Sequence, residues 1–130
     1  MTARVLEWVL EQLQNNSPVV LASVVGTKGS VPGKTGARLA MNRHQDWVGT
    51  VGGAGLEHRI LNRCKELIQE RKATSEVHTF GLNKGAKGYE VQPLDSLCGG
   101  QVTISLELML PMPHVLLMGG GHCSEAISIL

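Results

Sequence analysis

Two glycine-rich segments are the first places in this sequence where backbone and side chains could bind a ligand together. Residues 26–36 read GTKGSVPGKTG, and residues 49–59 read GTVGGAGLEHR. Glycine lets the backbone approach a ligand closely, and repeated backbone N–H groups beside Lys28, Lys34 and Arg38 favour an anion. A solvated surface loop in the first segment, and tight strand–helix packing in the second, are the alternatives. The residues alone leave them open.

The first segment is close to a phosphate-binding P-loop but does not complete one. That motif needs G-x-x-x-x-G-K-[ST] followed by a helix, whereas Lys28 stands at the first glycine position and residues 36–41 (GARLAM) read as a strand. The nucleotide-hydrolase interpretation is therefore excluded. The second segment is the better anion candidate, because its strand, glycine cluster and helix start lead to free N–H groups at a helix N-terminus. Glu57 in the first turn could satisfy that helix dipole instead.

The three cysteines differ in what they could do. Cys98 precedes Gly99 and Gly100, which leave room for a ligand to approach its sulfur, so it is the candidate for reactivity or soft-metal contact. A buried small residue at a strand start is an equal alternative. Cys64 falls on the apolar stripe of a helix, which favours an inert core thiol. An odd number of cysteines without a C-x-x-C pair indicates no disulfide framework and favours the cytoplasm.

A third glycine turn comes near the end of the chain. The apolar run at 114–118 leads into Gly119–Gly121 and then into a helix start at 124–130. This order approximates the dinucleotide fingerprint G-x-G-x-x-G, with Ser124 at the last glycine. The acidic residue that would bind a ribose lies beyond Leu130, so NAD(P) binding is expected only with a complete Rossmann domain.

The elements that must position these residues follow from hydrophobic periodicity. We predict an α/β fold: a mixed sheet with flanking helices, followed by the first strand-turn-helix of a truncated Rossmann unit. The first helix is amphipathic, with its apolar side formed by Val5, Leu6, Val9, Leu10 and Leu13. Helices are predicted over 3–14 and 56–72, strands over 19–25, 37–41, 47–51, 77–82 and 101–110, and a polar loop over 83–89.

Domain boundaries follow from the proline pair. Pro111-Met112-Pro113 interrupts both helix and strand, so it is expected to link a domain over 1–110 to an incomplete Rossmann-like start over 114–130. Because the chain stops at an apolar Leu130 within a helix start, we expect a cut edge or a segment that docks elsewhere. Strand exchange between two copies, and hence a homodimer, is one outcome of that arrangement.

Composition excludes several partners. Lys and Arg number 12 against 11 Asp and Glu, and only four of 130 residues are aromatic, so nucleic acid is not an expected partner. No apolar run approaches the ~20 residues of a membrane-spanning helix. The five histidines show no metal-ligand spacing.

Taken together, four motifs in order resemble the XdhC/CoxI family of molybdoenzyme maturation factors. They are the loop within VVLASVVGTKGSVPGKTGARLAM (19–41), the turn GTVGGAGLE (49–57), the thiol motif in LCGGQVTISLE (97–107) and the Rossmann start HVLLMGGGHCSEA (114–126). The order and spacing fit nearly the whole chain. The sequence departs from the family pattern at Ala54-Gly55 and at Gly33, where Lys34 is adjacent to the expected basic position.

The resemblance implies an accessory protein rather than an enzyme. It would bind the molybdenum cofactor (molybdopterin), assist its sulfuration with a cysteine desulfurase, and deliver it to an apo-molybdoenzyme of the xanthine dehydrogenase type. The cofactor-binding residues that it implies, together with the cations singled out above, are Gly29, Ser30, Lys34, Arg38, Gly52, Gly53, Glu57, Cys98, Gly99 and Gly100, with Cys98 as the metal contact. The other hypotheses are a fragment of an NAD(P)-dependent oxidoreductase and a purely structural or interaction module.

Overall fold

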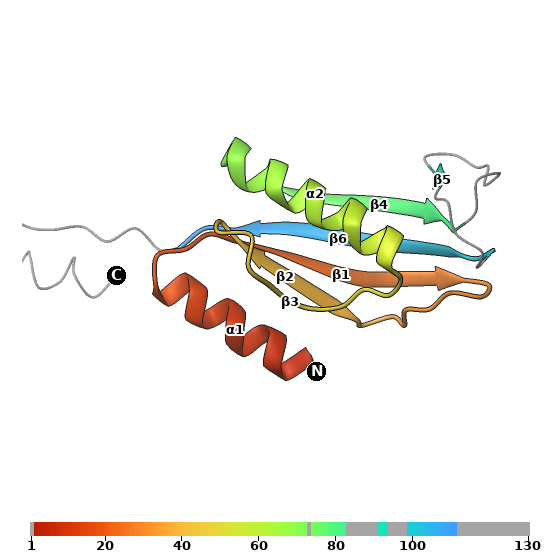
Figure 1. The fold of residues 1–130 in the computed structure, drawn as a ribbon, viewed down its shortest axis with the longest axis horizontal. Helices are drawn as coiled ribbons and strands as arrows, with labels where there is room; N and C mark the ends of the chain where they lie inside the picture. Colours follow the sequence, from red (N-terminus) through yellow and green to blue (C-terminus); the bar gives the residue numbers. More distant parts are fainter. Residues whose placement is uncertain (1, 73, 83–90, 94–98, 112–130) are drawn as a thin grey trace, which may run out of the picture.

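A computed structural model describes residues 2–72, 74–82, 91–93 and 99–111 of the chain. In these ranges six strands form one mixed sheet, and two helices pack against it (Figure 1). The helices are α1 (Thr2–Gln14) and α2 (Ala54–Glu70). The strands are β1 (Val19–Lys28), β2 (Arg38–Asn42), β3 (Trp47–Gly49), β4 (Ser75–Gly81), β5 (Val91–Pro93) and β6 (Gln101–Met109).

The strands lie in the order β3-β2-β1-β6-β4-β5. All neighbours are antiparallel except β4 and β5, which pair in parallel, so the sheet is mixed. The long strands β1 and β6 form the centre, with Val19 opposite Met109 at one end and Lys28 opposite Gln101 at the other. The mixed α/β fold class predicted from periodicity is confirmed.

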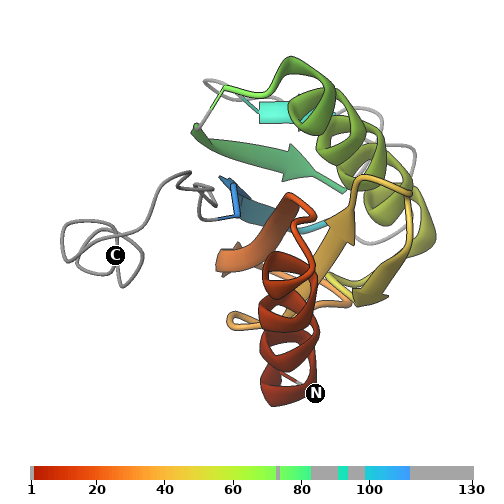
Figure 2. The ribbon, with the colours of Figure 1, turned by 90° about the vertical axis from the view of Figure 1, so that its left-hand side faces the viewer.

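The two helices cover opposite faces of the sheet (Figure 2). The main core lies under α2, where Ile60, Leu67, Ile104 and Leu106 are fully buried. A smaller cluster lies under α1, which packs on β1, β2 and β3. In the described residues no helix covers the α1 side of β6 and β4, so Thr79, Thr103 and Ser105 lie there beside the 65% exposed Val77.

The apolar side of α1 is narrower than the periodicity predicts. Val5 and Val9 are buried against the sheet, but Leu6 and Leu10 are 45% and 56% exposed. A helix resting on a sheet buries a stripe centred on positions i and i+4, and the residues one position further round face outward. The apolar side of α2 is confirmed, because Leu56, Ile60, Cys64, Leu67 and Ile68 are all buried.

Strand β1 is longer than predicted. Gly26, Thr27 and Lys28, expected as the start of the glycine loop, continue the strand beyond an irregularity at Val25. Their residue types favour a loop, but β6 provides backbone partners for them, and the ladder overrides local propensity. The short strand β5 was not predicted, since three residues carry no measurable periodicity.

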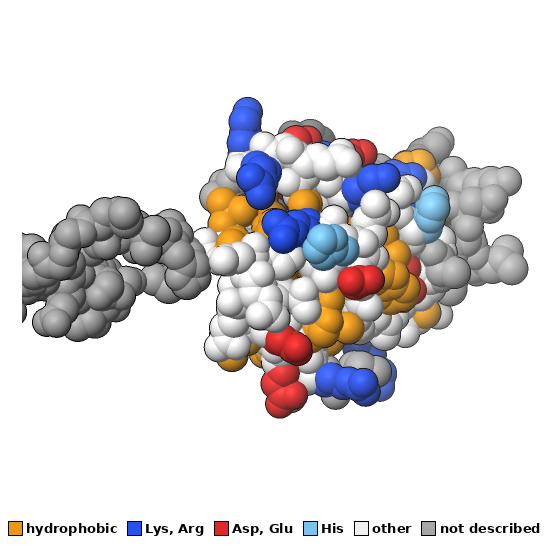
Figure 3. Space-filling view, turned by 60° about the vertical axis from the view of Figure 1, so that its left-hand side comes forward, with side chains coloured by type: hydrophobic (Ala, Val, Ile, Leu, Met, Phe, Trp, Pro, Cys, Tyr) orange, Lys and Arg blue, Asp and Glu red, His pale blue; other side chains and the backbone are white. Residues whose placement is uncertain are grey.

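Several expectations fall outside the described residues. They are the loop at 83–89, Cys98, and the Rossmann start at 114–130, so the division of the chain into two domains stays a prediction. In the ranges that the structure describes, no helix is long and apolar enough to cross a membrane. Basic, acidic and apolar side chains are interspersed over the face shown in Figure 3, and the whole chain carries a formal net charge of +1.

Candidate functional site

The two glycine-rich loops are packed directly against each other at the end of the sheet where β1 terminates. A Cβ atom built on Gly52 would lie 2.7 Å from the Gly33 nitrogen, and one built on Gly33 would overlap the Val51 carbonyl. The backbone φ of Gly52 is 93°, a value that residues with a Cβ atom rarely adopt. The two glycine-rich loops therefore converge, and Gly33 and Gly52 permit the contact because they lack a side chain.

The third glycine motif joins the same junction. A Cβ atom on Gly100 would lie 2.6 Å from the Lys28 carbonyl oxygen and 2.7 Å from the Val31 side chain. The Gly100 carbonyl also accepts a hydrogen bond of 2.8 Å from the Leu82 N–H. We call this contact of residues 28–33, 51–53 and 99–100 the glycine junction.

The glycines of the junction serve two purposes. Gly33, Gly52 and Gly100 fill close backbone contacts, so their role is packing. Gly53 and Gly99 have positive φ values of 70° and 103° and are exposed. These two glycines border the open side of the junction, where a ligand could approach the backbone.

The N-terminus of α2 opens onto this junction. Gly53 stands at the N-cap position and has no side chain to cap the first turn, whose N–H groups lack partners inside the helix. Glu57 does not supply the cap, since its carboxylate accepts from the Thr50 hydroxyl, which in turn accepts from the Gly52 N–H at 3.1 Å. Glu57 therefore braces the turn before the helix.

The three cations of the first glycine-rich loop and the strand after it differ in exposure. Lys28 and Lys34 are exposed, as is Ser30. Arg38, at the start of β2, is half-buried, and its guanidinium donates to the Gly36 carbonyl at 3.3 Å. Lys28 and Lys34 thus lie in or next to the junction with its backbone N–H groups, an arrangement suited to an anion, whereas Arg38 lies further along β2, opposite Ser23 of β1.

The structure separates two of the three cysteines. Cys64 is fully buried in α2, and burial raises the pKa of its thiol to about 12, so it is the inert core thiol that its position predicted. Cys98 lies outside the described residues. Its neighbour Gly99 borders the junction, and Gly29 lies on the other side of Gly100, with its own built Cβ 3.4 Å from the Gly100 Cα.

A second polar cluster lies away from the junction, between α2 and β4. Arg63 donates to both oxygens of Glu76, with its Nε 2.9 Å from Oε2, and it also pairs with Glu66 at 2.6 Å and Glu70 at 3.4 Å. These hydrogen bonds to Arg63 lower the pKa of Glu76 to about 2, and the same contacts raise the pKa of Arg63. Arg63 and Glu76 lie 13 positions apart and on different elements, so no local spacing indicates their pairing.

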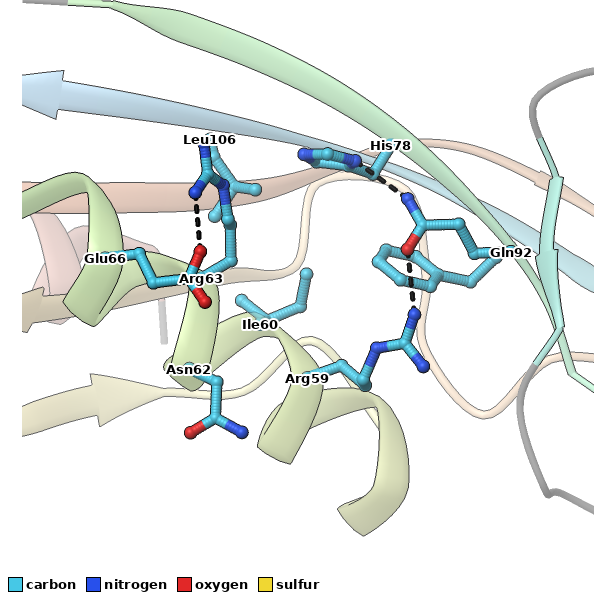
Figure 4. Close-up of a pocket in the computed structure, with 9 residues that line it drawn as sticks. Arg59, Ile60, Asn62, Arg63, Glu66, His78, Gln92 and Leu106 are labelled. Atoms are coloured by element: carbon cyan, nitrogen blue, oxygen red, sulfur yellow. Dashed lines mark hydrogen bonds and ion pairs between the residues drawn. The ribbon is translucent and has the colours of Figure 1, made fainter.

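The cluster continues through three further side chains (Figure 4). Arg59 donates to the Gln92 Oε1 at 2.8 Å, which turns the Gln92 amide nitrogen toward the His78 Nδ1 at 2.9 Å. The His78 Nδ1 must then accept, so its proton resides on Nε2, 2.8 Å from a Glu76 oxygen. This chain ties the short strand β5 to β4 and to α2.

A cleft of about 280 Å³ lies between these groups, over a floor formed by Ile60, Phe80 and Leu106. Arg59 also lies over the Phe80 ring, 5.8 Å from its centroid. Because the polar groups of the rim already satisfy one another, the cluster is better explained as a brace for β4 and β5 than as a ligand site. None of its members was predicted as a functional residue.

Comparison with known proteins identifies the family to which this chain belongs. A model of the XdhC and CoxI family matches residues 12–81, which include β1, both glycine-rich loops and α2. The chain belongs to this family. The resemblance that the four motifs indicated is confirmed, and two of those motifs lie inside the matched range.

Two relatives place this XdhC/CoxI chain among longer proteins. It is 28% identical over 115 residues to the uncharacterized protein YqeB of Escherichia coli (strain K12), covering 88% of this chain but 20% of that protein. A solved xanthine dehydrogenase from Bacillus halodurans matches with a TM-score of 0.60 and 24% identity, over 78% of this chain and 29% of that one. The second likeness shows a shared fold. The chain thus spans less than a third of either relative.

Proposed function

We propose that this XdhC/CoxI chain binds the molybdenum cofactor during maturation of a xanthine dehydrogenase-type molybdoenzyme. The observation that carries the proposal is the glycine junction, where three separate family motifs meet beside the uncapped N-terminus of α2. Family membership and the name of the solved Bacillus halodurans relative supply the enzyme class. The protein is proposed as an accessory factor rather than an enzyme.

The residues present fit such a ligand. The cofactor's phosphate suits the first turn of α2 at Gly53, with Lys34, which follows Gly33 of the junction, as a cation. Arg38 stays a predicted contact, at the start of β2. Exposed Gly29, Ser30 and Gly99 leave backbone N–H groups for its polar atoms. When bound, the cofactor supplies a dithiolene-held molybdenum, a soft metal for which the Cys98 thiolate is a suitable ligand. Gly52, Gly100 and Glu57 shape the junction rather than contact the ligand.

Two partners complete the proposal. A cysteine desulfurase would provide the sulfur for the cofactor, and an apo-molybdoenzyme would receive the sulfurated product. We retain a homodimer and the cytoplasm as expectations, the latter because the cysteine pattern favours a reducing compartment.

Cofactor retention by the purified chain tests the proposal. We expect Arg38→Ala and Cys98→Ala each to lower the molybdenum and pterin content per protein at least threefold, as loss of one charge-assisted or ligand contact implies. Lys72→Ala, at the far end of α2, and Cys123→Ala are the matched controls and should retain wild-type content.

One observation supports an alternative, a structural or interaction module. Gly33, Gly52 and Gly100 have packing roles that need no ligand. If wild-type protein retains no cofactor, or if Arg38→Ala and Cys98→Ala both retain as much as wild type, the cofactor assignment is wrong and the structural interpretation replaces it.

A further inference from the structure

A second, hydroxyl-lined pocket adjoins the glycine junction on the sheet face opposite α2. It has a volume of about 300 Å³ and is lined by Gly26, Thr27, Lys28, Thr79, Val91, Gln101 and Thr103. The register places Lys28 opposite Gln101 at the end of β1 and β6, immediately before Gly29 and after Gly100. The floor of the pocket is therefore continuous with the glycine junction along two neighbouring strands.

The pocket is lined mainly by polar side chains, although the residues at the centre of a sheet are often apolar. Thr79 and Thr103 face each other across β4 and β6 with their hydroxyl oxygens 3.1 Å apart. One hydroxyl donates to the other, so the accepting hydroxyl keeps a hydrogen for a further acceptor. The Gln101 amide offers both a donor and an acceptor. Among the described residues that line it, none is acidic and Lys28 is the one cation.

This set of groups selects a type of ligand. A bare phosphate needs several cations or many converging N–H donors, and the described part of the lining offers one lysine among neutral groups that both donate and accept. A flat heterocycle with an amide-type edge presents alternating donors and acceptors that such neutral groups can match. The volume is at the lower end of the ~300–1,000 Å³ typical of small-molecule sites, enough for a bicyclic ring.

We propose that this pocket binds the pterin ring of the ligand whose phosphate lies at the glycine junction. The inference rests on the proposed function and adds the orientation of the ligand. The ring lies on the hydroxyl-lined face of the sheet, and the phosphate lies toward Gly53 at the start of α2. Thr79, Thr103 and Gln101 are the specificity-determining residues for the ring. Gln101 and Thr103, on β6, belong to the third family motif, whereas Thr79, on β4, lies outside all four.

Free pterin, which is fluorescent, is the probe. Its binding to the chain is measured by fluorescence anisotropy for wild type, Thr79→Val, Thr103→Val and the double variant. Valine keeps the β-branched shape that suits a strand and removes only the hydroxyl. Each single variant should weaken binding about threefold to tenfold, the effect of one uncharged hydrogen bond. Thr103→Ser, which keeps the hydroxyl, should bind as wild type does.

The control is Thr74→Val, the same replacement just before β4 and outside the pocket lining. Wild type that fails to bind pterin, or a double variant that binds it as tightly as wild type does, would overturn the inference. Thermal unfolding of each variant separates a lost contact from a lost fold.

Cofactor retention separates this inference from the proposed function. If wild type and the double valine variant retain the cofactor equally while Arg38→Ala loses it, the function stands and the ring site is wrong. If no variant retains the cofactor but pterin binding still depends on Thr79 and Thr103, the ring site stands and the cofactor assignment fails.

Discussion

At the scale of single residues, burial decides which reactive groups are available. Cys64 sits in a packed aliphatic core, where water cannot stabilise a thiolate, and Glu76 sits against Arg63, where its charged form is stabilised. The Cys64 thiol is thereby kept protonated and unreactive, and the Glu76 carboxylate is kept ionised. Both effects can be measured on the purified chain.

The first prediction concerns thiol reactivity. In a Cys98→Ala/Cys123→Ala variant only Cys64 remains, and its buried thiol, with a pKa raised to about 12, should not react with a disulfide reagent at pH 8. Reaction is expected to appear only in denaturant. Rapid labelling of the folded variant would contradict this prediction, because it would show that the Cys64 side of α2 is exposed to solvent.

The second prediction concerns acid stability. The pKa of Glu76 is lowered to about 2 in the folded chain, so its pairing with Arg63 contributes stability that is present above the ordinary carboxyl pKa and lost as pH falls toward 2. Glu76→Gln should lower the free energy of unfolding by about 1–3 kcal/mol at pH 7.

The pH profile is the discriminating readout. The difference between wild type and Glu76→Gln in denaturant unfolding should shrink as pH falls from about 5 to 2, because wild type alone loses the charge. Glu7→Gln, on the exposed side of α1, serves as the control and should change stability by less than about 0.5 kcal/mol. A difference independent of pH would contradict the assignment.

At the scale of elements, the loops that connect the strands and helices at the glycine junction are held together by close backbone contacts more than by side chains. Loop 29–36 and the turn before α2 meet where neither has room for a Cβ atom, and Gly100 fixes the start of β6 to the same point. The brace from Arg59 through Gln92 to His78 holds β5 in a comparable way.

The third prediction compares two glycines three positions apart. Gly52→Ala should destabilise the chain by about 2 kcal/mol or more, because its φ is 93° and the added Cβ meets Gly33. Gly55→Ala, in the first turn of α2, meets no described atom within 4 Å and should stabilise by up to about 1 kcal/mol. Thermal unfolding of both variants measures the contrast, and equal shifts would contradict the packed junction.

At the scale of the whole molecule, the two faces of the sheet are unequal. The face under α2 carries the main core, from Val20 and Leu39 to Leu108. The other face is covered by α1 over β1, β2 and β3, while β6 and β4 present Thr103, Ser105 and Thr79 there. The main core therefore stabilises one face, and the proposed ring pocket lies on the other.

The fourth prediction follows from that asymmetry. Leu106→Ala removes a fully buried side chain between β6 and α2 and should cost about 2–5 kcal/mol in the free energy of unfolding. Leu10→Ala makes the same chemical change on the 56% exposed side of α1 and should cost less than about 1 kcal/mol. Urea unfolding of both measures it, and a large loss at Leu10 would mean that this side of α1 is covered in solution.

The local elements, the family and the inert Cys64 thiol could all be predicted from the order of the residues. The period of the apolar residues set α2 and the strands, because burial of one face requires that period. Four motifs in order identified the XdhC/CoxI family, since backbone approach at each needs glycine.

Which of those residues lie side by side follows from tertiary contacts. The extension of β1 to Lys28, the parallel strand β5 and the Arg63–Glu76 pair depend on partners from elsewhere in the chain. The pairing of Lys28 with Gln101 likewise brings the Thr79–Thr103 pocket beside the glycine junction. Long-range contacts such as these leave no local period or spacing, so sheet register and side-chain packing alone could assemble the site.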